Sequence, residues 1–222
     1  KKRMIRVMEG RTTSQGTACS SDPFFISADA GVPEARLRKA EALRYLYLAG
    51  SEPAPVTGTP KDLLVVTSFF RDETEAHLKL LAEALQAGLL KGFNVTVKPH
   101  PYLPVQERLS ELLHGRTEGL RFSTAPIAEE LACNPLVWAS NSTTVALEAA
   151  IKGLPVMVMQ PSGDFDLCPL QNIKELPRTS NLDDVRAGIA SAAPLSLAPD
   201  YLLLDTSLTA WRTMLGLRHM GS

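Results

Sequence analysis

The sequence predicts an α/β fold with a doubly wound, mostly parallel sheet. After Pro60, short apolar runs alternate at least four times with longer segments of helical periodicity. The run 63–66 is apolar throughout, which is typical of a strand buried on both faces. Glycines follow several of the helical segments, as expected where helices end. Because parallel neighbours need crossover helices, this alternation favours a parallel sheet with helices on both faces.

The elements follow in a regular order. Strands are expected at 63–66, 94–98, 120–123, 136–139 and 155–159. Helices are expected at 72–92, 105–113, 126–132, 143–152, 182–192 and 207–215. The first of these opens on acidic residues, which favour a helix N-terminus, and Gly92 is expected to close it. Upstream, a short strand is expected at 24–27 and a helix at 33–48.

The composition changes along the chain and suggests boundaries. Residues 1–22 are polar and aperiodic, and we interpret them as loop or disordered. Residues 23–60, with a proline-rich end, are interpreted as a remnant of an N-terminal domain and a linker. Residues 61–216 form the predicted Rossmann-like domain, and 217–222 form a tail of vector-like character.

The charge and cysteine content exclude several classes of function. With 23 basic and 24 acidic residues, the net charge of −1 gives no footprint for nucleic acid. The three cysteines are widely spaced, so neither a disulfide framework nor a metal site is expected. Charged residues and proline interrupt the most apolar stretch, 143–159, so no membrane span is expected. A reducing, cytoplasmic location fits these features.

The candidate site lies where the strands end, because ligands bind beyond the carboxyl ends of strands in such sheets. Lys98, Pro99, His100 and Pro101 follow the strand 94–98 directly. The prolines restrict the backbone around the histidine, so a fixed imidazole and an ammonium would face one anion, such as a phosphate oxygen. The alternative is a rigid turn whose histidine caps a backbone group.

A second polar group follows the strand 136–139. It opens a helix with five consecutive hydroxyl or amide side chains, Ser140, Asn141, Ser142, Thr143 and Thr144. Such residues either cap the helix or present hydroxyl and N–H donors to a phosphate. Five exceed what a cap requires, which favours phosphate binding.

Further residues are candidates for contacts with a ribose or a sugar. Glu148 is a lone carboxylate in an apolar helix, where it either faces the ligand or pairs with Lys152 at the surface. Thr67, Ser68 and Gln160 each follow a predicted strand. The sequence has no Walker loop, no GxGxxG motif and no GxSxG elbow.

The His100-Pro101 and Ser142-Thr143 pairs resemble the HP and S-S/T motifs of bacterial surface-polysaccharide glycosyltransferases. The similarity covers roughly 60–195 and is to the C-terminal, donor-binding half of two-domain GT-B enzymes, in particular Kdo transferases and polysialyltransferases. It implies a CMP-linked sugar as substrate, with Lys98, His100 and the 140–144 turn on the phosphate and no cofactor or obligatory metal. It also implies a catalytic base outside these residues.

The same resemblance implies partners and a place of action. We expect a glycan or lipid-linked acceptor bound by an N-terminal domain, at the inner face of the inner membrane, in lipopolysaccharide or capsule synthesis. Two alternatives stay open: a UDP-sugar transferase or epimerase-like domain of the same fold, and a non-catalytic scaffold domain of polysaccharide assembly.

Overall fold

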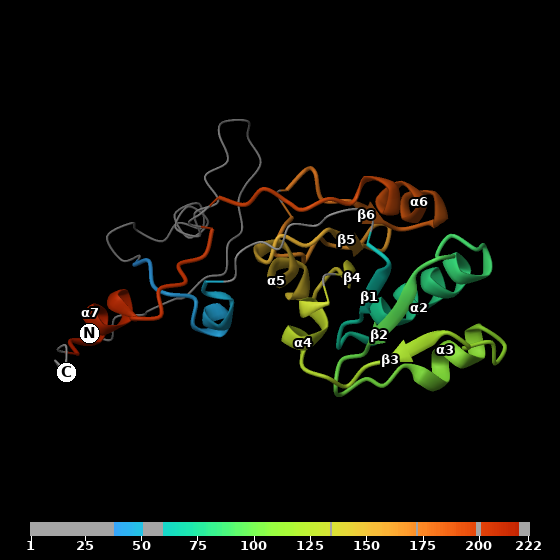
Figure 1. Ribbon diagram of the computed structural model, residues 1–222, viewed down its shortest axis with the longest axis horizontal. Helices are drawn as coiled ribbons and strands as arrows, with labels where there is room; N and C mark the ends of the chain where they lie inside the picture. Colours follow the sequence, from blue (N-terminus) through green and yellow to red (C-terminus); the bar gives the residue numbers. More distant parts are fainter. Residues whose placement is uncertain (1–37, 51–59, 134, 172, 199–200, 218–222) are drawn as a thin grey trace. The chain divides into compact units, whose positions relative to one another are not determined.

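The computed structural model describes residues 38–50, 60–133, 135–171, 173–198 and 201–217 (Figure 1). The expected loop at 1–22, the strand at 24–27, most of the linker and the end of the tail lie outside these ranges.

The sheet is built around β1 (Asp62–Val66), whose apolar residues are buried on both faces. It pairs in parallel with β2 (Asn94–Lys98) on one side and with β4 (Leu136–Ser140) on the other. Outside these lie β3 (Leu120–Phe122), β5 (Val156–Met159) and β6 (Arg178–Thr179). The strand order is β3-β2-β1-β4-β5-β6 and every named neighbour is parallel. This is the strand order of a Rossmann-like domain.

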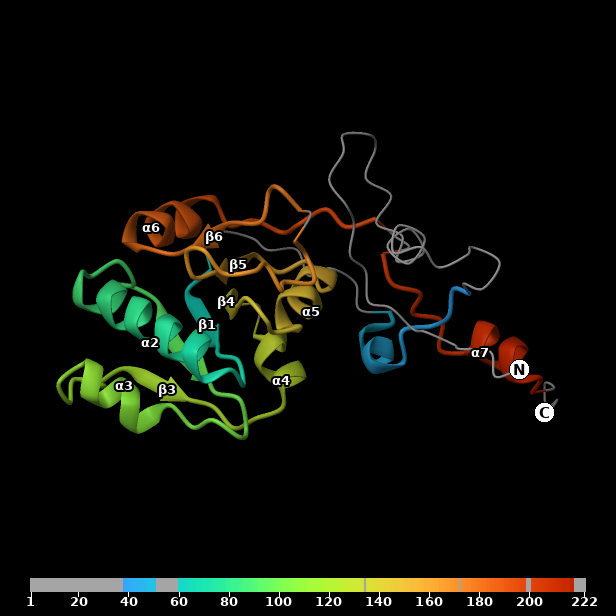
Figure 2. The same ribbon diagram turned by 180° about the vertical axis from the view of Figure 1, so that it is seen from behind.

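Helices cover both faces of this sheet (Figures 1 and 2). One face carries α2 (Arg71–Gln86), α3 (Gln106–Leu112) and α6 (Leu182–Ser191), and the other carries α4 (Ile127–Ala132) and α5 (Val145–Ile151). The core beneath the first set includes Trp138, whose indole N–H donates to the Thr179 hydroxyl at 2.9 Å. The predicted doubly wound α/β class is therefore confirmed.

Helix α2 is shorter than predicted because Gly88, not Gly92, ends it. Gly88 has a φ of +71°. Its N–H donates to the Leu85 carbonyl at 3.1 Å, and the Leu89 N–H donates to the Ala84 carbonyl at 3.0 Å. This pair of bonds is a Schellman motif, which satisfies the last carbonyls of the helix. Leu89, expected on the helix, lies beyond it.

The helix predicted at 33–48 is wrong in the part that the structure describes. Residues 38–42 are not helical there, and Leu43–Leu48 form a 3-10 helix. The reason lies in competing partners: the Ala42 N–H donates to the Leu203 carbonyl at 2.9 Å, and the Glu41 carboxylate accepts from the Ala210 and Trp211 N–H groups. The two-residue strand β6 was not predicted.

The chain divides into two compact units. One unit contains the sheet and spans 53–169 and 173–196. The other includes the 3-10 helix and α7 (Thr209–Leu215). The predicted domain 61–216 had included α7. The sequence-based boundaries stay predictions. Within the ranges described above, no helix is long and apolar enough to cross a bilayer.

The close approach of α6 to the sheet gives a stability prediction. A Cβ at Gly188 would lie 3.2 Å from the Met157 Sδ and 3.4 Å from the Thr179 Cγ2. We expect Gly188→Val to lower the free energy of unfolding by about 1–3 kcal/mol in urea melts, because the site is already filled. The control is Ala187→Val, at an exposed position of the same helix. Equal losses in the two variants would contradict the close packing.

Candidate functional site

The strand order creates a switch point between β1 and β4. From β1 the chain moves outward to β2 and β3, and from β4 it moves in the opposite direction to β5 and β6. In open parallel sheets ligands bind in the crevice at the carboxyl ends of the strands beside such a point. Thr67 follows β1 there, and Ser140 ends β4.

The end of β1 holds one hydroxyl without a partner. Thr67 is 2% exposed, and its backbone N–H donates to the Lys98 carbonyl at 3.2 Å. Its side-chain Oγ1 is buried and has no hydrogen-bond partner. Ser68 differs, because its Oγ accepts from the Phe70 N–H at 2.9 Å and its carbonyl accepts from the Thr74 hydroxyl at 2.9 Å. Of the two predicted contact residues, Ser68 thus bonds to residues at the start of α2, whereas the Thr67 hydroxyl does not.

His100 stands in a tight turn after β2. The Leu103 N–H donates to the His100 carbonyl at 2.9 Å, and Pro101 is exposed. The Nδ1 atom accepts a long bond of 3.4 Å from the Tyr102 N–H, which favours the tautomer with its proton on Nε2. The imidazole also contacts two aromatic rings, with centroid distances of 5.7 Å to Phe69 and 5.5 Å to Tyr102. The ring thus lies among aromatic side chains at the carboxyl edge of the sheet, and its fixing by the prolines stays a prediction.

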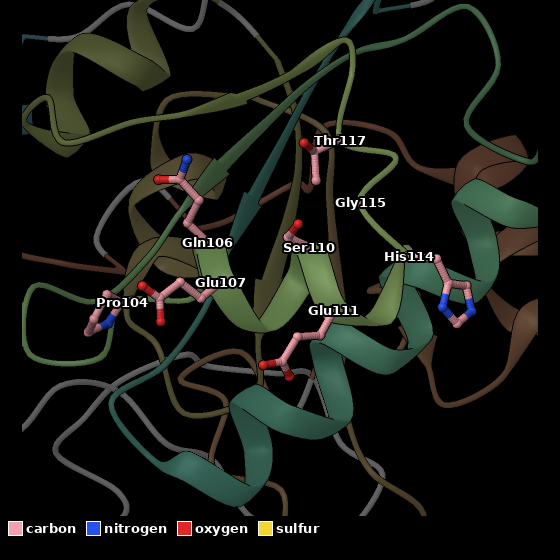
Figure 3. Close-up of a pocket in the computed structure, with 8 residues that line it drawn as sticks. All are labelled: Pro104, Gln106, Glu107, Ser110, Glu111, His114, Gly115 and Thr117. Atoms are coloured by element: carbon pink, nitrogen blue, oxygen red, sulfur yellow. The ribbon is translucent and has the colours of Figure 1, made fainter.

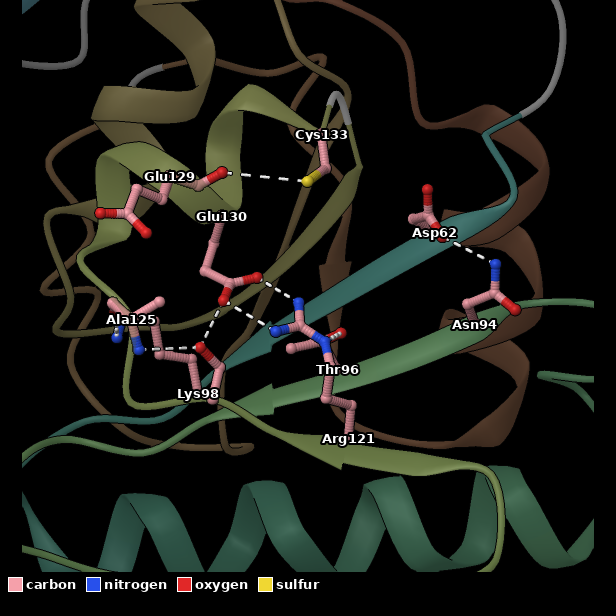
Figure 4. A network of polar contacts seen from close by, with 10 residues as sticks. Asp62, Asn94, Thr96, Lys98, Arg121, Ala125, Glu129, Glu130 and Cys133 are labelled. Carbon is pink, nitrogen blue, oxygen red and sulfur yellow. Dashed lines mark hydrogen bonds and ion pairs between the residues drawn. The ribbon is translucent and has the colours of Figure 1, made fainter.

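Lys98 belongs to a polar network at the end of β3 (Figure 4). Its ammonium donates to the Ala125 carbonyl. Nearby, the Glu130 carboxylate pairs with Arg121 and accepts from the Ser123 hydroxyl. The bond from Arg121, more than any other neighbour, lowers the pKa of Glu130, and the charge of Lys98 adds to this. In this structure Lys98 therefore supports the loop that follows β3, and phosphate binding by it stays a prediction.

The turn after β4 divides its polar residues between different tasks. Ser140 is fully buried, and its Oγ lies 2.8 Å from the Nδ1 of His77 on α2. Asn141 donates to the Phe165 carbonyl at 2.8 Å and accepts from the Leu167 N–H at 3.2 Å. Asn141 thus fixes the loop after β5, a supporting role that the sequence did not indicate.

Ser142 presents both of its donors to one carboxylate. Its N–H donates to the Glu73 Oε1 at 2.8 Å, and its hydroxyl donates to the Oε2 at 2.5 Å. Glu73 lies in the first turn of α2. The contact therefore joins the helix that follows β1 to the turn that follows β4, across the switch point.

The two threonines and Glu148 complete this side of the site. Thr143 Oγ1 accepts from the Val145 N–H at 3.4 Å, and no side chain caps α5 at Thr144. The Thr144 hydroxyl instead donates to the Glu148 carboxylate at 3.3 Å. Glu148 is 4% exposed, so the alternative of a surface pair with Lys152 is wrong. A buried carboxylate one turn from the switch point can accept hydroxyl groups of a ligand.

The remaining predicted residue, Gln160, follows β5, and its N–H donates to the Thr179 carbonyl at 3.0 Å. A separate surface hollow lies along α3, lined by Glu107, Glu111 and His114 among others (Figure 3). It contains none of the predicted site residues. In the described part of the chain, no three His, Cys, Asp or Glu side chains are grouped so as to hold a metal ion.

Sequence reasoning missed two residues of α2 that border the site. Glu73 was interpreted only as a helix-start residue, and nothing local links it to Ser142, 69 positions away. His77 was not singled out, although it lies three positions after Thr74 and four before Leu81, at helical spacing, on the face that the structure buries. That spacing was a usable signal for a buried histidine.

Comparisons with known proteins identify a class of fold. No protein-family model matches the chain, and no curated protein matches its sequence. The structure of S. aureus MnaA with UDP aligns with a TM-score of 0.58 at 9% identity, covering 90% of this chain and 59% of that one. A Methanocaldococcus jannaschii UDP-GlcNAc 2-epimerase in complex with UDP-GlcNAc and UDP aligns with a TM-score of 0.53 at 11% identity, covering 86% and 57%.

A putative UDP-N-acetylglucosamine 2-epimerase from Listeria monocytogenes gives a TM-score of 0.53 at 14% identity, covering 88% of this chain and 56% of that one. The chain thus spans less than two thirds of each of these structures. At such identities the likeness defines the fold, a GT-B-like Rossmann domain. None of the three is named as a Kdo transferase or polysialyltransferase, so the narrower resemblance gains no support from them.

Burial of His77 gives a pH-dependent prediction. The ring is fully buried against Trp138, and desolvation lowers the pKa of His77 from 6.5 to about 3. Between pH 6.5 and 3 this histidine is protonated in the unfolded chain but stays neutral in the folded chain. The free energy of unfolding therefore falls as the pH falls from 6.5 towards 3. Between pH 6.5 and 5, we expect the free energy of unfolding of His77→Gln to fall by about 1–2 kcal/mol less than that of the wild type in urea melts.

The control for this measurement is His114→Gln, at an exposed histidine. It should keep the wild-type dependence on pH. A His77→Gln profile that parallels the wild type over the same range would contradict the neutral, buried state of His77.

Proposed function

We propose that the sheet-containing unit binds a nucleotide sugar at the carboxyl edge between β1 and β4. The observation that carries the proposal is the grouping at one switch point of anion donors and a buried carboxylate. His100 supplies a ring N–H, Ser142 supplies an N–H and a hydroxyl, and Glu148 supplies an acceptor. A phosphate requires the donors, and a ribose hydroxyl suits the carboxylate, as in other doubly wound nucleotide-binding domains.

The base is proposed to be uracil rather than cytosine. The preference for CMP came from the resemblance to Kdo transferases and polysialyltransferases. The structures that share the fold are named for UDP and UDP-GlcNAc instead. This favours the alternative of an epimerase-like domain that uses a UDP-sugar over the CMP-sugar transferase.

The activity of the whole protein is proposed to need a further lobe. The chain spans 56–59% of the three named structures, so residues beyond those aligned contribute to their folds. We infer that this chain supplies nucleotide binding and that the reacting sugar lies between it and such a lobe. The base for catalysis, the acceptor, the cytoplasmic location and the link to surface polysaccharides stay predictions.

A transferase remains the second candidate, supported by the resemblance of His100-Pro101 and Ser142-Thr143, which follow β2 and β4, to the HP and S-S/T motifs. A transfer step breaks the bond between sugar carbon and phosphate oxygen, and negative charge grows on the leaving phosphate. Donors fixed in advance, such as the His100 Nε2–H and the Ser142 N–H, stabilise that charge. Both candidates therefore use the same phosphate site.

Calorimetric titration with UDP, UMP, CDP and CMP tests the proposal. We expect UDP to bind most tightly and His100→Ala to weaken it about tenfold or more, because a charge-assisted bond to the phosphate is lost. The control His114→Ala removes an exposed histidine in the hollow along α3 and should bind UDP as the wild type does. Equal affinity in His100→Ala would contradict the phosphate site, and preference for CMP would restore the first resemblance.

A further inference from the structure

The carboxylate of Glu73 occupies the donor pair that the proposed function assigns to a phosphate. Both of its oxygens are held by Ser142, at 2.8 Å from the N–H and 2.5 Å from the hydroxyl. An N–H beside a hydroxyl is the kind of donor pair that binds a phosphate oxygen. The chain therefore already places one of its own anions at the donors beside the switch point.

Two anions cannot share one donor pair without a large electrostatic cost, since like charges at contact distance repel strongly. We propose that Glu73 determines which ligands the site accepts: a phosphate binds at Ser142 only when it displaces the Glu73 carboxylate. This inference rests on the proposed function and adds a selecting residue to it. A ligand without a phosphate has no anionic group to displace the carboxylate from these donors, so it leaves Glu73 in place.

The displacement needs only a side-chain rotation. Helix α2 is tied to the same edge by two other bonds, from the Thr74 hydroxyl to the Ser68 carbonyl at 2.9 Å and between His77 and Ser140 at 2.8 Å. Because these bonds do not involve Glu73, the helix stays in place when its carboxylate leaves Ser142. Glu73 is partly exposed, so water can receive the released carboxylate.

The alternative role for Glu73 is purely structural, as a further tie between α2 and the turn after β4. The two roles predict opposite effects on binding. Removing a structural tie loosens the edge between β1 and β4 and weakens nucleotide binding. Removing a competitor strengthens it, and does so only for ligands that carry a phosphate.

The test compares Glu73→Gln with Asp72→Asn. Asp72 lies one position away in the same first turn of α2, and no Ser142 donor contacts it among the bonds that the structure describes. Both variants remove one negative charge from the same helix end, so the control subtracts the general change in field. Titrations with UDP and with uridine, at about 0.15 M salt to screen distant charges, measure binding.

We expect Glu73→Gln to bind UDP about tenfold more tightly than the wild type, Asp72→Asn to change the affinity less than threefold, and uridine affinity to be the same in all three. Glu73→Ala, which leaves Ser142 without any acceptor from this position, should match or exceed the gain of Glu73→Gln. Thermal unfolding of each variant establishes that it is folded.

Unchanged or weaker UDP binding in Glu73→Gln and Glu73→Ala would overturn the inference and leave the nucleotide site standing. An equal gain in Asp72→Asn would overturn it as well, because the effect would then be one of general charge. Absence of UDP binding in the wild type and in every variant would overturn the proposed function itself, and the inference with it.

Discussion

Parallel pairing of β1 with both β2 and β4 is the constraint on which the rest of the structure depends. Parallel strands end at the same edge of a sheet, so the residues that follow β1, β2 and β4 are brought together although they are far apart in the chain. The register aligns Val66 with Lys98 and with Ala139. Because the apolar residues of β1 are buried, a slip of this register would break the packing of the core around Leu63 and Val65.

Helix α2 is the element that this constraint turns into part of a site. Glu73 bonds to Ser142 across the edge, Thr74 beside it bonds back to Ser68 in the loop before the helix, and His77 one turn later bonds to Ser140. The last two are buried ties and hold the helix in position, whereas Glu73 is partly exposed and engages donors suited to an anion. The same helix therefore borders the proposed site and supplies a charge that any phosphate would have to displace. A site of this kind would bind a nucleotide with less affinity than its donors allow, whereas a ligand without a phosphate would leave Glu73 in place.

Much of the fold follows from local pattern, and the side-chain roles do not. The apolar run at 63–66 and the helical periodicity after it are sufficient to predict the sheet and its helices, because burial of these residues leaves few other arrangements. Helix α2 ends at Gly88 and not at Gly92 because the turn at Gly88 lets the Leu89 N–H donate to the Ala84 carbonyl. The roles of Asn141 and Glu73 depend on partners that only the folded chain brings near. The sheet edge that carries the candidate site could be predicted from the sequence, but the hydrogen-bond partners of its residues could not.

The most direct test of the account is an NMR titration of the isotopically labelled chain with UDP, following the backbone amide signals. The account predicts that the signals of Thr67, His100 and Ser142 shift together with one affinity, because these residues share the edge where β1, β2 and β4 end. Shifts confined to the hollow along α3, or none at millimolar UDP, would contradict the central claim that this edge is the nucleotide site.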